Sequence, residues 1–162
     1  MNDKTTEAKN KVQFVLQKIY IKDLSFESPQ PIEFFTALKE PPEINLQLNT
    51  ETQKVSADVY EIVISITVNA KPKNSDKTMY LVEVKQAGLF TLGNFPQQEL
   101  TQIMHTYCLN ILFPYARETV SAVVERGGFP QLLLAPINFD ALYQEHVNRL
   151  KATAKAPTHA KH

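Results

Sequence analysis

The pair of residues that most resembles catalytic machinery in this sequence is His105 and Cys108, which lie three positions apart. On a helix this spacing places both side chains on one face, where an imidazole can activate a thiolate nucleophile. No orienting carboxylate or oxyanion loop accompanies the pair, so we interpret it as a core thiol beside a surface histidine. A cysteine-dependent enzyme remains an alternative that rests on these two residues alone, and we expect no enzymatic activity.

Other patterns that carry chemistry are missing from the sequence. None of the four glycines belongs to a phosphate-binding loop, and the four histidines and one cysteine lack the spacing of a zinc site. We therefore expect no metal and no other cofactor. A single cysteine forms no internal disulfide, residues 1–10 lack the apolar core of a secretory signal, and no run is long enough to span a membrane. These features predict a cytoplasmic location.

The charge balance argues against nucleic acid as the main partner. Lys and Arg number 17, as do Asp and Glu, so the formal net charge is zero. Phosphate binding requires a basic excess or a basic stripe, and the sequence has neither outside its last few residues.

The stretch from residue 28 to residue 42 is unusual because it combines four prolines with several large apolar side chains. Prolines exclude a regular helix or central strand throughout the stretch. Long apolar connections are more often functional than idle, so we weigh two compatible interpretations: a lid that packs on the core, and a wall of an apolar groove for extended peptide. The apolar residues concerned are Ile32, Phe34, Phe35 and Leu38.

Three acidic residues form a second candidate set with one leucine. Asp23 and Glu27 follow the first predicted strand, and Glu83 lies beside Leu81 on the polar face of the last one. Taken singly, each acid is interpreted as a solvated surface residue. The sequence does not tell whether the three lie together.

Four stretches alternate apolar and polar residues with a period of two, as half-buried strands do. They span residues 12–20, 44–49, 60–69 and 80–85. The turn-forming segment 71–76 predicts a hairpin between the third and fourth strands. One polar face per strand predicts an antiparallel sheet that is covered on one side.

Three later stretches have helical spacing. The first follows Pro96, the second runs from Pro114 to Arg126 before a pair of glycines, and the third follows Asn138 as its N-cap. The second helix is apolar on two sides, so it needs a second surface to bury against. We therefore expect a homo-oligomer whose interface includes Tyr115, Val120, Val123 and Val124.

The ends of the chain differ in composition from the middle. Residues 1–10 and 152–162 are polar and lack periodicity, which is typical of disordered tails. The sequence thus predicts one domain over residues 11–151, with the second tail basic.

Several motifs of this chain resemble the SecB family of protein-export chaperones. The resemblance covers residues 14–150 and is most specific in NILFPYARE at residues 110–118. It continues in RGGFPQL at residues 126–132 and APINFDAL at residues 135–142. The strand segments YIKDLSFE at residues 20–27 and LVEVKQAGLF at residues 81–90 also resemble that family.

The resemblance implies an α+β fold, in which helices pack on one face of a four-stranded antiparallel sheet, and assembly as a homotetramer, a dimer of dimers. It implies an ATP-independent chaperone that binds unfolded precursors in the cytosol, keeps them competent for translocation and delivers them to the SecA motor of the translocon. It also implies SecA-binding positions at Asp23, Glu27, Leu81 and Glu83, and a client groove at the proline-rich stretch. The alternative is a general or toxin-antitoxin-linked chaperone of the same fold that is not coupled to SecA.

Overall fold

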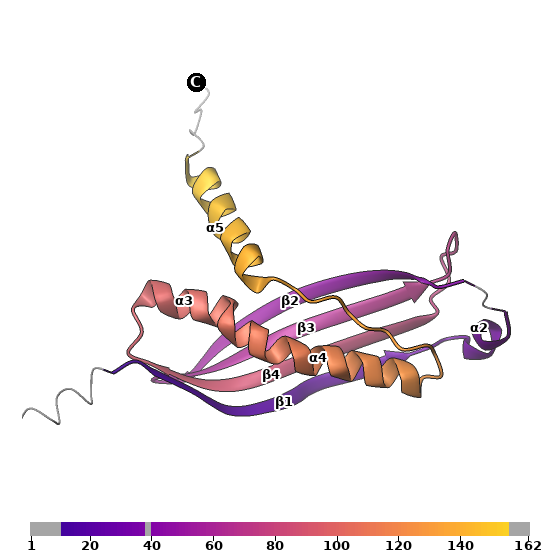
Figure 1. The fold of residues 1–162 in the computed structure, drawn as a ribbon, viewed down its shortest axis with the longest axis horizontal. Helices are drawn as coiled ribbons and strands as arrows, with labels where there is room; N and C mark the ends of the chain where they lie inside the picture. Colours follow the sequence, from indigo (N-terminus) through magenta and orange to yellow (C-terminus); the bar gives the residue numbers. More distant parts are fainter. Residues whose placement is uncertain (1–10, 38–39, 156–162) are drawn as a thin grey trace, which may run out of the picture.

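Four antiparallel strands form the sheet in the computed structural model, which describes residues 11–37 and 40–155 (Figure 1). The strand order is β1-β4-β3-β2, and the predicted hairpin between the third and fourth strands is confirmed. The strands are β1 (Gln13–Glu27), β2 (Glu43–Ser56), β3 (Val59–Lys71) and β4 (Tyr80–Gly93).

β1 runs seven residues past Tyr20, where the sequence predicts its end. Its pairing with β4 shifts register twice, between Leu16 and Lys18 and between Ile21 and Asp23. Each shift reverses the face to which alternate side chains point, so a continuous strand loses its period of two in the sequence.

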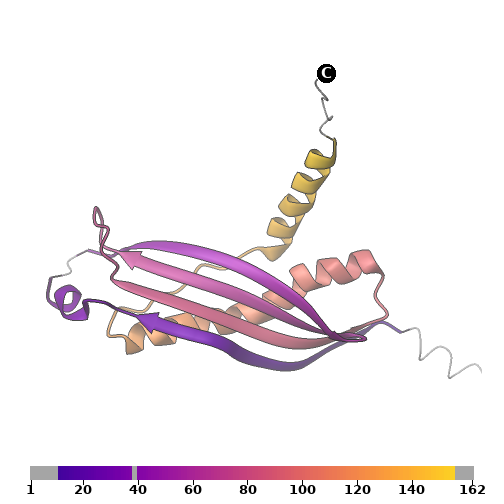
Figure 2. The same ribbon diagram turned by 180° about the vertical axis from the view of Figure 1, so that it is seen from behind.

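One face of the sheet is apolar and the other is polar, as the alternation predicts. In β3, Ile62, Ile64 and Ile66 are fully buried on the helix-covered face. The opposite face of the same strand carries Glu61 and Thr67, which stay partly exposed. Figure 2 shows that this opposite face has no helix across it.

The helices α3 (Gln97–His105) and α4 (Tyr107–Arg126) lie across the apolar face (Figure 1). α2 (Pro31–Ala37) lies near the end of β1, inside the proline-rich stretch. α5 (Phe139–Lys155) extends away from the sheet. The predicted packing of helices on one face is confirmed for α3 and α4, whereas α5 leaves the sheet.

The second predicted helix begins earlier than expected. α4 starts at Tyr107, directly after a break at Thr106, and contains Pro114 in its interior. The proline removes one hydrogen bond, to the carbonyl of Asn110. Both residues are exposed, which places the proline on the solvent side of the helix. The cost is outweighed by the buried face of the helix, where residues on both sides of the proline pack on the sheet. They include Leu109, Leu112, Ala116, Val120 and Val124.

The last helix begins as the sequence predicts and ends later. The Asn138 side-chain oxygen accepts a hydrogen bond from the backbone N–H of Ala141 at 3.0 Å, which is an N-cap. α5 continues to Lys155, whereas the sequence places the start of the tail at Ala152. The rest of that tail and the predicted tail at residues 1–10 lie outside the described residues.

Candidate functional site

An apolar cavity of about 460 Å³ lies between the start of β2 and the segment that follows α4. β2 is an edge strand, and α4 contacts β4, β3 and β1 instead, so the apolar side chains of β2 stay partly exposed. Ile44 and Leu46 are 37% and 41% exposed. We call this cavity the edge groove. Its lining comprises Glu40, Pro41, Pro42, Ile44, Met79, Tyr80, Phe129, Pro130, Gln131 and Leu132.

An aromatic cluster builds the inner wall of the edge groove. The ring of Phe129 lies 5.0 Å from the ring of Tyr80 and 5.2 Å from that of Phe35, measured between centroids. Phe26 joins the cluster at 6.1 Å from Tyr80. Burial raises the pKa of the Tyr80 phenol, as expected for a group held against apolar rings. Packed rings of this kind give the groove a preformed wall.

The proline-rich stretch contributes to the groove differently from what the sequence predicts. Phe34 is only 6% exposed and belongs to the core, whereas Ile32 is 75% exposed on the outer side of α2. Phe35 is half-exposed and does not line the edge groove itself. Its ring packs against the ring of Phe129, which does. Leu38 lies outside the described residues. Phe34 packs on the core, as the lid interpretation expects, and the same stretch reaches the edge groove through Glu40, Pro41 and Pro42.

Sequence reasoning did not identify Met79, Tyr80 and Phe129 as lining residues of the edge groove. Tyr80 was predicted to begin the fourth strand, and Phe129 follows the glycine pair that was predicted to end a helix. The available signal was the segment from Phe129 to Leu132, an apolar run directly after the glycine pair.

The four residues of the second candidate set do lie on one face of the sheet. The register between β1 and β4 pairs Glu27 with Leu81, and Ser25 with Glu83. Directly paired residues of an antiparallel ladder point to the same face. Since Val82 is buried in the core, Leu81 and its alternate neighbours point to the helix-free face of Figure 2. We call Asp23, Glu27, Leu81 and Glu83 the acidic face.

The register shift between Ile21 and Asp23 creates the acidic face. Without this shift, Asp23 and Glu27 would point towards the core side, because a one-residue change of register turns every following side chain to the other face of the sheet. Asp23 is paired with Lys85 in the ladder. Among the described residues, no ion pair engages Asp23, Glu27 or Glu83. The three carboxylates are exposed and available to a partner.

A neighbouring acid on the same face, Glu61, already has two hydrogen-bond partners. Lys22 donates to Glu61 at 2.6 Å, and the phenol of Tyr20 donates to the other carboxylate oxygen. These hydrogen bonds lower the pKa of Glu61. Burial, together with the Glu61 carboxylate, raises the pKa of Tyr20 to about 12. Glu61 is therefore a structural acid, distinct from the acidic face.

The structure separates His105 and Cys108 between two helices. His105 ends α3 and Cys108 belongs to α4, with the break at Thr106 between them, so the expected single helical face does not exist. Cys108 is fully buried, and burial raises the pKa of its thiol to about 12. A buried thiol of this kind is a poor nucleophile.

The four predicted interface residues divide between two environments. Val120 and Val124 are fully buried against the chain's own sheet. Tyr115 is 51% exposed and Val123 is partly exposed. Only these last two have side-chain area left for a second copy of the chain.

Two features are absent from the described part of the chain. No three His, Cys, Asp or Glu side chains gather there in an arrangement that would hold a metal ion. None of its helices is both long enough and apolar enough to cross a membrane.

Comparison with known proteins places these features in a family context. The family described as preprotein translocase subunit SecB matches residues 7–150. A protein of Nitrosococcus oceani named protein-export protein SecB is 48% identical, covering 98% of this chain and 96% of the relative. A protein of the same name from Methylococcus capsulatus is 47% identical, covering 90% and 92%.

A solved structure is similar in fold. The Mycobacterium tuberculosis SecB-like chaperone Rv1957, in complex with a ChAD peptide from the HigA1 antitoxin, superimposes with a TM-score of 0.57. The match covers 77% of this chain and 91% of that chain at 18% identity, so it bears on the fold alone.

Proposed function

Because this chain belongs to the SecB family of preprotein translocase subunits, a family of protein-export chaperones, we propose that it holds unfolded precursors and delivers them to SecA. It does so in the cytoplasm, without ATP, without a cofactor and without a chemical step. The observation that carries the proposal is the edge groove, a preformed apolar cavity along an edge strand.

The edge groove suits a client that is unfolded. Folded proteins bury their apolar side chains, whereas an unfolded precursor exposes them. Removing apolar area from water contributes about 25 cal/mol per Å² without directional demands, so one groove accepts many sequences. The edge strand β2 adds backbone groups that pair with an extended chain regardless of its sequence. The SecB-like chaperone of Mycobacterium tuberculosis was itself solved with a bound peptide.

The acidic face suits a basic segment of SecA. Asp23, Glu27 and Glu83 are exposed carboxylates on the sheet face without helices, and Leu81 provides an apolar contact among them. Exposed charges of this kind govern the rate of encounter and its dependence on salt more than the final affinity.

A tetrameric assembly, a dimer of dimers, completes the proposal. α4 retains exposed apolar area at Tyr115 and Val123 after it packs on its own sheet. A second copy would cover this area and would bring several edge grooves into one particle. Linked weak sites raise the overall avidity for a long client through their high effective concentration.

The experiment that tests the proposal measures the size of the protein alone, with a urea-denatured precursor and with SecA, by light scattering after gel filtration. We expect a tetramer, a complex with the denatured precursor but not with the same protein in its folded form, and a complex with SecA. Slower refolding of the precursor should accompany the first complex.

Two outcomes would contradict different parts of the proposal. A protein that ignores denatured precursor has no holding function. A protein that binds precursor but not SecA is a chaperone uncoupled from the motor, which is the alternative implied by the fold.

A further inference from the structure

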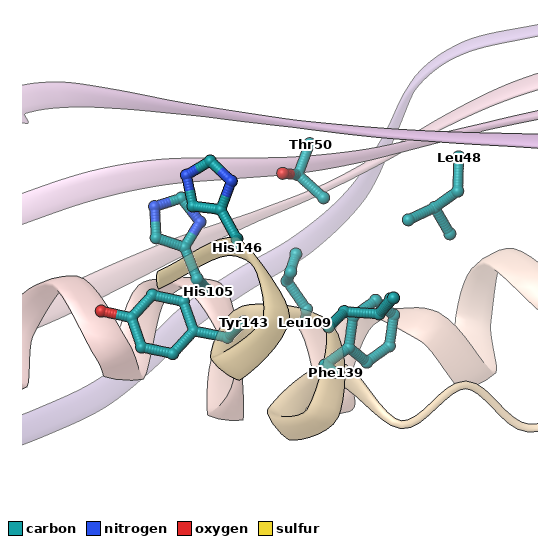
Figure 3. A pocket seen from close by; sticks show the side chains of 8 residues that line it. Leu48, Thr50, His105, Leu109, Phe139, Tyr143 and His146 are labelled. Atoms are coloured by element: carbon teal, nitrogen blue, oxygen red, sulfur yellow. The ribbon is translucent and has the colours of Figure 1, made fainter. Parts of the chain in front are cut away.

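Two histidines from different helices share a cavity at the contact between α3 and α5. His105 is the last residue of α3, His146 lies in the middle of α5, and both line a cavity of about 260 Å³ (Figure 3). We call it the α3–α5 pocket. Its other lining residues are Leu48, Thr50, Leu109, Phe139, Leu142 and Tyr143.

The α3–α5 pocket is a poor environment for a positive charge. The ring of Tyr143 stacks on the His105 ring at 5.9 Å between centroids and an interplanar angle of 12°. Figure 3 shows the His146 imidazole next to the His105 imidazole, on the same side of the pocket. Apart from these two imidazoles and the Tyr143 phenol, the residues that line the pocket carry no ionisable group. No carboxylate among them is present to stabilise an imidazolium.

The electrostatics follow from this arrangement. Burial lowers the pKa of His105, and the nearby His146 lowers it further. The contact between the helices therefore favours the neutral form of His105. A helix that leaves the contact releases the His105 imidazole into water, where burial no longer disfavours its charged form.

The attachment of α5 to the rest of the molecule is slight. Phe139 is the one buried residue of this helix, and Leu142 is 45% exposed. The helix projects away from the sheet, as Figure 1 shows. A contact of this size is displaced by a modest change in free energy.

We propose that the contact between His105 and His146 makes the docking of α5 acid-sensitive, so that protonation of His105 releases α5 and opens the α3–α5 pocket. Release exposes Leu48 of β2 and Leu109 of α4, which extends the apolar strip that begins at the edge groove. The proposal concerns the position of α5 and is independent of client and SecA binding.

The sign of the effect follows from proton linkage. The docked state binds fewer protons than the released state, because the pKa of His105 is lower when α5 is docked. Docking is therefore fully stable above the ordinary histidine pKa of 6.5 and weakens as the pH falls below it, down to the lowered pKa.

Nuclear magnetic resonance titration of the imidazole protons tests the electrostatic part. We expect the His105 midpoint to lie below 6.5 and to rise when His146→Gln removes the second positive charge. An unchanged His105 midpoint in the His146→Gln variant would overturn the proposed coupling.

A fluorescence experiment tests the movement of α5. The chain contains no tryptophan, so Leu142→Trp at a half-exposed pocket position introduces a single reporter. Between pH 7.5 and pH 5.5 we expect a reversible red shift of its emission, and we expect the shift to disappear when His105→Gln is added. Circular dichroism on the same samples should be unchanged. A constant emission, a shift that survives His105→Gln, or a simultaneous loss of sheet signal would each overturn the proposal.

Discussion

The ring of Phe26, near the end of β1, lies so close to Gly127 that a methyl group on this glycine would overlap the ring. Gly127 follows the last residue of α4, in an ordinary helical conformation. Its lack of a side chain therefore serves close packing rather than an unusual backbone angle. This contact fixes the end of α4 against the strand that carries Asp23 and Glu27.

Gly127→Ala should destabilise the protein by about 1–3 kcal/mol, because an extra methyl group in a packed site forces side chains away from their preferred positions. Urea denaturation measures this change. Phe26→Leu should relieve the overlap, so the double variant should lose less than the sum of the two single variants. Strict additivity would contradict the contact.

Tyr20→Phe should weaken the sheet by about 1–2 kcal/mol, because it removes a hydrogen bond to the Glu61 carboxylate. It should also flatten the stability profile in acid. The folded pKa of Glu61 lies below 4.5, so its contribution is present above that value and is lost as the pH falls through the lowered pKa. Urea midpoints between pH 3 and pH 7 measure both effects. An unchanged acid profile in the variant would show that Tyr20 does not lower this pKa.

Glu83→Lys should lower the affinity for SecA by about tenfold at low salt, mainly through slower association, and by less at high salt. Glu51→Lys is the matched control, because Glu51 pairs with Val63 and lies on the same sheet face at the opposite edge. Binding kinetics on immobilised SecA at two salt concentrations measure the difference. Equal losses for both variants would indicate general charge steering in place of a local site.

Ile44→Thr should weaken the binding of a denatured client roughly threefold to tenfold, because it replaces apolar area in the edge groove with a hydroxyl. Val55→Thr makes the same kind of change in the same strand, at an exposed position outside the groove. Titration with a labelled unfolded precursor compares the two. The proposal for the groove fails if the control loses as much affinity as Ile44→Thr.

Alkylation of Cys108 should be very slow in the native protein at pH 8 and fast in urea. Burial moves the thiol pKa from 9.0 to about 12, which lowers the thiolate fraction by about three orders of magnitude. Mass spectrometry after timed treatment with iodoacetamide measures the rates. Rapid alkylation of Cys108 in the native protein, or a loss of client binding that parallels the alkylation, would indicate that this cysteine has a functional role.

The sheet could be read from the sequence because its strands have one wet face. Alternation in β3 identified both the strand and the side of the sheet that the helices cover. The second half of β1 was not predicted, because two register shifts interrupt the alternation of apolar and polar residues along the strand. The start of α4 was also predicted wrongly. A proline commonly occupies the first position of a helix, and the local sequence around Pro114 does not indicate that tertiary packing stabilises a helix on both sides of it.

The candidate sites divide in the same way. The residue types of the acidic face were recognised, but only the register between β1 and β4 brings them together. The edge groove depends on residues from three separate segments around Ile44, Tyr80 and Phe129. No local pattern specifies that they meet, since their proximity is a property of the strand order and of the path that the chain takes after α4.

Tyr80 and Leu81 are neighbours in β4, yet one lines the edge groove and the other belongs to the acidic face. The thickness of a single sheet therefore separates the surface proposed for the client from the surface proposed for the motor. Under these two proposals a client and SecA would use opposite faces of one subunit, so neither would have to vacate a position for the other to arrive. Transfer of the client would then require that SecA, bound to one face of the sheet, weakens client binding in the edge groove on the other face, because the two ligands do not compete for the same residues.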